Sequence, residues 1–233
     1  MKTSFHPDIE NYLVGQIISE NIKTAFIFEK YGLKLHGNLS LTVKELKLNP
    51  AIDYENLLEE LIKNMELKDI IVDYKNASTD LIVDYIEQYH HSRLKSVLPV
   101  LLKKGKILSE LNDHQIIKDL YSLIFAMAED IYPHMDMEEK KLFPVIRTYL
   151  HYKDDLCNIK ELFREKINVA FLEHEEASGL LKEINKLCDS YDPPEDLGKD
   201  GKEYFRLVRD FSDDMYEHIM LEEQVLFPRL ADF

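Results

Sequence analysis

Cysteine and long apolar runs are scarce in this chain. Its 233 residues include two cysteines, Cys157 and Cys188, which are too few for a disulfide framework or an all-thiolate zinc site. No apolar run approaches the ~18 residues that a membrane span needs. The opening stretch, MKTSFHPDIENYLV, lacks the continuous apolar segment and small-residue cleavage site of a signal peptide. We therefore expect a cytoplasmic protein with no membrane partner.

Basic charge and turn-forming residues are also in short supply. Lys and Arg number 29 against 44 Asp and Glu, which gives a formal net charge of −15. Phosphate binding needs concentrated Lys and Arg, so we expect no nucleic-acid partner. Seven glycines and eight prolines, with abundant Leu, Ile, Glu and Lys, favour helices over a turn-rich β fold. The 45% of hydrophobic residues suffices for one or two buried cores.

Asn76, Ser78 and Thr79 mark a break that divides the chain into a small helical N-terminal domain, 1–75, and a larger domain, 76–233. The first is expected to hold a helical stretch over 8–31 and two short helices, with Thr42 and Glu45 forming a capping box. In the second, short turns link long helices, which predicts an antiparallel four-helix bundle. The class is therefore all-α, and the four long helices are expected at about 79–104, 113–149, 153–189 and 200–230.

An internal repeat is the clearest organisational signal. The pattern H-x3-E-E-x2-L-F-P-x-[IL] begins at His134 and again at His218, which is 218 − 134 = 84 residues later. His91 precedes the first copy by 43 residues, and His174 precedes the second by 44. The adjacent His90 fits the spacing slightly better, because 134 − 90 = 44. The repeat predicts two similar helical hairpins and a pseudo-two-fold site between them.

The repeated His and Glu side chains occupy positions where apolar residues would face the core. Residues four apart lie on the same face of a helix, so His134 and Glu138 can hold one object, as can His218 and Glu222. A carboxylate buried without a partner costs several kcal/mol, so two such carboxylates require a cation. Nitrogen and oxygen ligands without thiolate suit iron, with manganese or zinc as substitutes. Glu139 and Glu223 rotate off this face, and we interpret them as solvated or as supporting the ligands.

At these residues the sequence resembles the RIC (repair of iron centres) family of hemerythrin-like di-iron proteins. The segment from His91 to Pro99 resembles the family's H-x6-L-P, and this anchor selects His91 over His90. The segment His174-Glu175-Glu176-Ala177 and the two H-x3-E copies resemble the other three ligand segments. The resemblance implies two iron ions with an oxo or hydroxo bridge. It also implies that Glu138 and Glu222 bridge the two irons. The terminal ligands that it implies are four histidines: His91, His134, His174 and His218.

The resemblance further implies a role in repairing iron–sulfur clusters damaged by nitrosative or oxidative stress, through iron donation or redox at the di-iron site. The expected partners are iron–sulfur client proteins and the diatomic ligands NO and O2, and a homodimer is an open alternative. Reduction of NO, or binding and sensing of NO or O2, are the rival functions. One departure stands out: where the family usually has Cys-Cys-Gly-Gly, this chain has Leu35-His36-Gly37-Asn38. No thiolate is available at that turn.

Overall fold

The structure is a computed structural model that describes residues 9–21, 23–35, 38–66, 74–111, 113–151, 159–188 and 193–231. Every regular element in these ranges is helical, which confirms the all-α prediction. The chain divides into two compact units, Met1–Tyr85 and Ile86–Phe233. Within the first unit, the Tyr85 ring packs edge-on against Phe26, with ring centroids 5.2 Å apart.

The N-terminal unit is built from short helices. A single helical stretch was expected over 8–31, and the structure breaks it at Asn21, where the backbone is extended and the side-chain carbonyl accepts the Lys23 N–H at 3.0 Å. Buried apolar residues between Ile9 and Leu61 share one core. The bounds are η1 (Ile9–Asn11), α1 (Val14–Glu20), α2 (Thr24–Lys30), the 3-10 helix η2 (Val43–Leu48), α3 (Tyr54–Glu66) and α4 (Thr79–Tyr85).

Side-chain caps start two of these helices. Thr42 Oγ1 accepts the Glu45 N–H at 3.3 Å, and the Glu45 carboxylate accepts the Thr42 N–H at 2.7 Å, so the predicted capping box is confirmed. Ser78 Oγ accepts the Leu81 N–H at 3.2 Å and begins α4. The turn that holds His36 lies outside the described residues.

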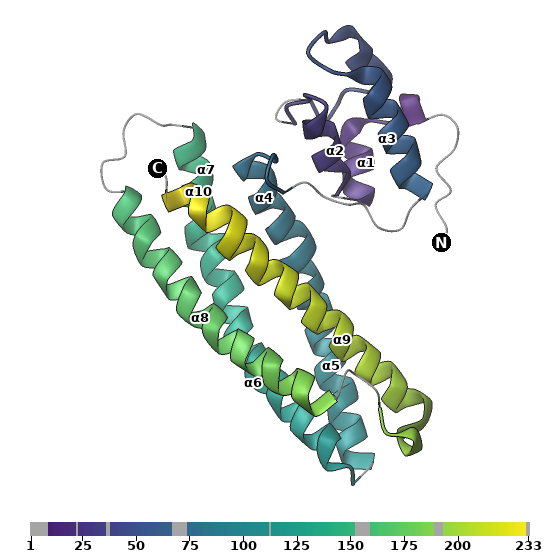
Figure 1. Ribbon diagram of the computed structural model, residues 1–233, viewed down its shortest axis with the longest axis vertical. Helices are drawn as coiled ribbons and strands as arrows, with labels where there is room; N and C mark the ends of the chain where they lie inside the picture. The colour runs from purple at the N-terminus through teal and green to yellow at the C-terminus, as the bar shows by residue number, and fades with distance from the viewer. Residues whose placement is uncertain are drawn as a thin grey trace. The chain divides into compact units, whose positions relative to one another are not determined.

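Four long helices form the second unit (Figure 1). α5 packs against α6 and α9, and α8 packs against α6 and α9, so each helix has two neighbours and the four enclose one apolar core. This is the predicted four-helix bundle. The bounds are η3 (Ile86–His91), α5 (Ser92–Leu111), α6 (Gln115–Met137), η4 (Glu138–Leu142), α7 (Phe143–His151), α8 (Ile159–Cys188), the 3-10 helix η6 (Glu195–Leu197), α9 (Gly198–Leu221), η7 (Glu222–Leu226) and α10 (Phe227–Ala231).

The predicted end of the first long helix near Gly105 was wrong. The helix continues through Gly105 to Leu111. A Cβ atom at residue 105 would lie 2.5 Å from the Tyr204 hydroxyl and 3.0 Å from Cζ of the same ring. Glycine at this position therefore allows α5 and α9 to approach closely and does not mark a helix end.

Three of the helices contain a wide, π-helical turn: η3, η4 and η7. In η4 the Phe143 N–H bonds to the Glu138 carbonyl, five residues back, and in η7 the Phe227 N–H bonds to the Glu222 carbonyl in the same way. A proline follows each phenylalanine. Proline cannot donate to the carbonyl four residues back and collides with it, which favours a widened turn just before it. π-helical turns are frequent at functional sites.

Candidate metal centre

The three π-helical turns and three α-helices carry the six predicted site residues. His91 ends η3, Glu138 begins η4 and Glu222 begins η7. His134 and His218 lie one turn before the glutamates, in α6 and α9. His174 comes from α8. All six side chains are buried in the bundle, with relative exposures of 0–2%.

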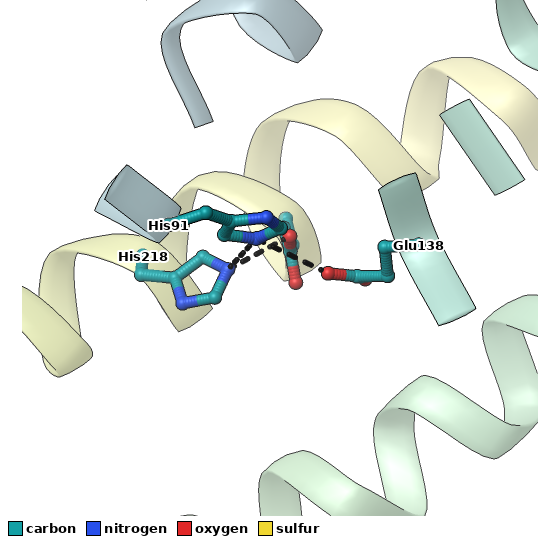
Figure 2. Close-up of side chains that lie close together, drawn as sticks. His91, Glu138 and His218 are labelled. Atoms are coloured by element: carbon teal, nitrogen blue, oxygen red, sulfur yellow. Dashed lines mark hydrogen bonds and ion pairs between the residues drawn. The ribbon is translucent and has the colours of Figure 1, made fainter. Parts of the chain in front are cut away.

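The six residues form two clusters that share both glutamates. One cluster joins His91 and His218 to Glu138 and Glu222, and the other joins His134 and His174 to the same glutamates. Within each cluster the ligand atoms all lie within 4.8 Å of one another. Figure 2 shows the rings of His91 and His218 and the Glu138 carboxylate directed toward one another. Each cluster takes one histidine from each hairpin, as a pseudo-two-fold arrangement requires.

Both glutamates lie between the clusters. The Glu222 carboxylate places Oε1 3.0 Å from His218 Nε2 and Oε2 2.9 Å from His174 Nε2, so it directs one oxygen to each cluster. Glu138 Oε2 lies 3.4 Å from His91 Nε2 and 3.3 Å from His134 Nε2. A carboxylate in such a position can connect two cations.

The imidazole pairs fit a metal ion. His91 Nε2 lies 3.2 Å from His218 Nε2, and His134 Nε2 lies 3.3 Å from His174 Nε2. Metal–nitrogen bonds of about 2.0–2.1 Å place neighbouring ligand nitrogens about 3 Å apart. A cation between the two nitrogens of each pair would bind both lone pairs at once.

Buried carboxylate oxygens without hydrogen bonds point to the same conclusion. Both carboxylate oxygens of Glu138, and Oε2 of Glu222, are buried without a hydrogen-bond partner. Burial and the neighbouring Glu222 charge raise the pKa of Glu138. Burial acts in the same direction on Glu222, but His218 and His174 outweigh it and hold the pKa of Glu222 well below its usual range. Such groups are stable in a core when they coordinate a metal.

Three outer glutamates orient three of the imidazoles. The Nδ1–H groups of the rings donate to these carboxylates: His91 to Glu139 at 2.9 Å, His134 to Glu173 at 2.7 Å and His174 to Glu223 at 3.2 Å. A hydrogen bond at Nδ1 leaves Nε2 free to bind a metal, which is the usual support for metal-bound histidine. Of the two interpretations of Glu139 and Glu223, as solvated or as supporting the ligands, these hydrogen bonds favour the second. Glu173 was missed, although its place directly before His174 in a Glu-His-Glu-Glu string is a signal.

The fourth imidazole has a different surrounding. His218 Nδ1 is buried without a hydrogen-bond partner, and burial lowers the pKa of this ring to about 3, so it stays neutral. The His90 ring stacks against it with centroids 5.9 Å apart. His90 Nδ1 lies 3.1 Å from Asp214 Oδ1. His91 therefore belongs to the cluster and His90 lies behind it, while the role of Asp214 had no sequence signal.

Two phenylalanines from the repeated L-F-P strings cover the centre. The Phe143 ring stacks on His91 with centroids 5.6 Å apart, and the Phe227 ring stacks on His174 at 6.0 Å. Both phenylalanines are buried. They agree with the interpretation of these residues as packing that keeps water from the site.

The comparison with protein families decides the family. The Hemerythrin HHE cation binding domain matches residues 82–230, which include all six site residues. The chain belongs to this family. Its hemerythrin-like bundle is a cation-binding domain, and its two His/Glu clusters are arranged for two metal ions.

Similar proteins extend beyond the hemerythrin-like bundle. The chain is 25% identical over 218 residues to the "Iron-sulfur cluster repair protein YtfE" of Enterobacter sp. (strain 638). It is 26% identical over 218 residues to the proteins of the same name from Escherichia coli O17:K52:H18 and Shigella boydii serotype 4. Each match covers 93% of this chain and 94% of the relative, so the similarity includes the N-terminal unit. None of the described helices is long and apolar enough to span a membrane.

Proposed function

We propose that this chain is a non-haem di-iron protein that helps to restore damaged iron–sulfur clusters. The observation that carries the proposal is the pair of four-residue clusters that share Glu138 and Glu222 in a buried core. Four imidazoles and two carboxylates, without thiolate, suit iron, and manganese or zinc are the substitutes. The relatives named as iron–sulfur cluster repair proteins, similar over nearly the whole chain, support the cellular role.

The protein's own residues explain how such a site could hold and release iron. Bound iron would supply redox chemistry or serve as cargo for a damaged cluster. Glu138 and Glu222 each reach both positions, so either carboxylate can shift an oxygen from one position to the other without leaving the core. The outer glutamates hold the imidazoles in place while this happens. The proposed clients are iron–sulfur proteins that have lost iron.

Metal analysis of the full chain tests the centre. Protein purified without chelator should contain about two irons per chain, and His134→Ala and Glu222→Ala should each lose them while keeping their helical circular dichroism. A wild-type protein that holds no metal after anaerobic reconstitution with iron(II) would contradict the centre.

A transfer assay tests the repair role. The iron-loaded protein should restore the visible absorption of a [4Fe–4S] protein that has been treated with NO, whereas the Glu222→Ala variant should not. Restoration by free iron(II) at the same rate would contradict a specific role for this chain.

Open coordination positions favour a second candidate, binding or reduction of NO. Each cluster offers four side-chain ligands from the described residues, fewer than the six of an octahedral metal. Two electrons, one from each reduced iron, together with two protons from solvent, would convert two NO molecules to N2O and one water molecule. Anaerobic addition of NO to the reduced protein discriminates: stoichiometric N2O supports reduction, and a stable nitrosyl without N2O supports binding alone.

A further inference from the structure

The two metal positions differ in the groups that surround them, although the repeat that builds them is nearly symmetric. The pseudo-two-fold relation pairs His91 with His174, Glu139 with Glu223, and Phe143 with Phe227. These pairs make matching contacts, since each glutamate accepts from the histidine Nδ1 and each phenylalanine stacks on the ring. One turn after each histidine, however, the sequence differs: Lys95 follows His91, and Ser178 follows His174.

On the first side, Lys95 pairs with the carboxylate that supports His91. Its Nζ lies 2.6 Å from both carboxylate oxygens of Glu139. Glu139 therefore accepts from His91 and from Lys95 together. The ammonium group of Lys95 balances the charge of this carboxylate. A carboxylate that is already paired with a lysine attracts a cation less than one without a lysine partner.

On the second side, no lysine contacts Glu223 among the described residues, and a cavity of about 690 Å³ opens there. His174 itself lines this cavity, together with Ser178, Glu175 and Glu223. The Glu223 side chain is 30% exposed, and that of Glu173, which supports His134, is 38% exposed. Carboxylates at the mouth of an opening raise the local concentration of cations.

The remaining surroundings add to this difference. The His218 ring of the first position is fully buried, and the buried His90–Asp214 pair packs behind it. The corresponding ring of the second position, His134, is backed by the partly exposed Glu173 carboxylate. The first position is therefore enclosed on both of its imidazoles, whereas the second meets the cavity at His174.

We infer that the position held by His134 and His174 exchanges its metal through the cavity beside Ser178 and Glu223, while the position held by His91 and His218 retains its metal behind the Lys95–Glu139 pair. The inference rests on the proposed dinuclear centre and assigns the donated metal to one of its two positions. Because Ser178 stands in place of a lysine, Glu223 is held by His174 alone among the described residues, and it can turn toward the cavity and accompany a departing cation. The centre would then release one metal ion, while the other stays bound and keeps the bundle folded.

Release of metal to a chelator tests the inference on the full-length protein. The chain is loaded anaerobically with two iron(II) ions and mixed with an excess of a coloured iron(II) chelator, and the release is followed by absorbance. Wild-type protein should release one equivalent fast and one slowly. Ser178→Lys should slow the fast phase about tenfold, because it restores the lysine–carboxylate pair, and Lys95→Ser should accelerate the slow phase about tenfold.

Matched substitutions of the same charge change serve as controls. Ser122→Lys on α6 and Lys103→Ser on α5 lie twelve residues from His134 and His91, which is about 18 Å along a helix, and should leave both phases unchanged. Equal release rates for both metals in the wild type, or unchanged rates in Ser178→Lys and Lys95→Ser with two metals still bound, would overturn the inference. Failure to bind two metals at all would instead overturn the proposed centre.

Discussion

At the scale of single residues, hydrogen bonds decide which atom of each imidazole faces the centre. Glu139, Glu173 and Glu223 each accept from an Nδ1–H, so three rings present Nε2 to the core. The ligands follow from the repeat and from helical spacing in the sequence, except that the choice of His91 over His90 rested on the family resemblance. The supporting groups follow less readily, because a glutamate beside a ligand rotates off the ligand's face and its partner lies on another helix.

The Glu138 carboxylate is expected to cost stability when no metal is bound. Both its oxygens are buried without hydrogen bonds, and the Glu222 charge is close enough to raise its pKa. Glu138→Gln removes one of the two like charges from the core. We expect the metal-free variant to melt no lower than the metal-free wild type, and added metal to raise its melting temperature far less.

Thermal melts with and without iron(II) measure both quantities, and Glu59→Gln on the N-terminal unit is the control for loss of an exposed carboxylate. A metal-free Glu138→Gln protein that is less stable than the wild type by more than about 2 kcal/mol would show that the carboxylate stabilises the core by itself.

The buried thiol of Cys188 is expected to be inert. Burial raises its pKa to about 12, so almost no thiolate, the reactive form, exists below pH 10. In a Cys157→Ala variant, the remaining thiol should react with an aromatic disulfide reagent at pH 8 at least 100-fold more slowly in native protein than in denaturant. Rapid reaction of the native protein would show that the end of α8 opens.

At the scale of helices, the departures from a regular α-helix coincide with the site. Apolar spacing predicted the four long helices, because burial of one face dominates each of them. It could not reveal η3, η4 and η7, since a π-helical turn shifts the helix by one residue and leaves the composition unchanged. Nor could the spacing predict that the helix continues through Gly105, because glycine is required there by the Tyr204 ring, which comes from another helix.

The π-helical turn η4 sets the angle between His134, Glu138 and Phe143. Deletion of the exposed Lys140 would turn the five-residue bond from Phe143 to Glu138 into an ordinary four-residue one. The helix should persist, but its later part would rotate relative to His134. We expect metal affinity to fall about 100-fold or more, measured by competition with a chelator, with little change in circular dichroism.

Lys140→Ala is the matched control, because it removes the side chain and keeps the turn. It should bind two metals as the wild type does. Wild-type affinity in the deletion variant would mean that the wide turn has no part in positioning the ligands.

At the scale of the whole molecule, the chain separates a metal-dependent unit from one that carries no described site residue. The repeat predicted the pairing of hairpins, since duplicated strings fold alike. It could not settle His90 against His91, because the number of residues between the paired helices differs: one pair is separated between Leu111 and Gln115, and the other between Cys188 and Glu195. The spacing of the histidines also does not reveal that Lys95 pairs with Glu139 at one metal position, whereas Ser178 lines a cavity at the other.

Metal removal should therefore act on one unit more than on the other. A ligand present at 100 times its dissociation constant stabilises the state that binds it by about 2.7 kcal/mol, and binding requires the bundle to be folded. Hydrogen exchange of the full-length protein should show faster exchange in α5, α6, α8 and α9 after chelation, by about 100-fold for amides that exchange through global opening of that unit. Amides of α2 and α3 should change by less than about threefold, because their core is separate. Equal acceleration in both units would mean that the two unfold together, and no acceleration in the bundle would place the metal outside its core.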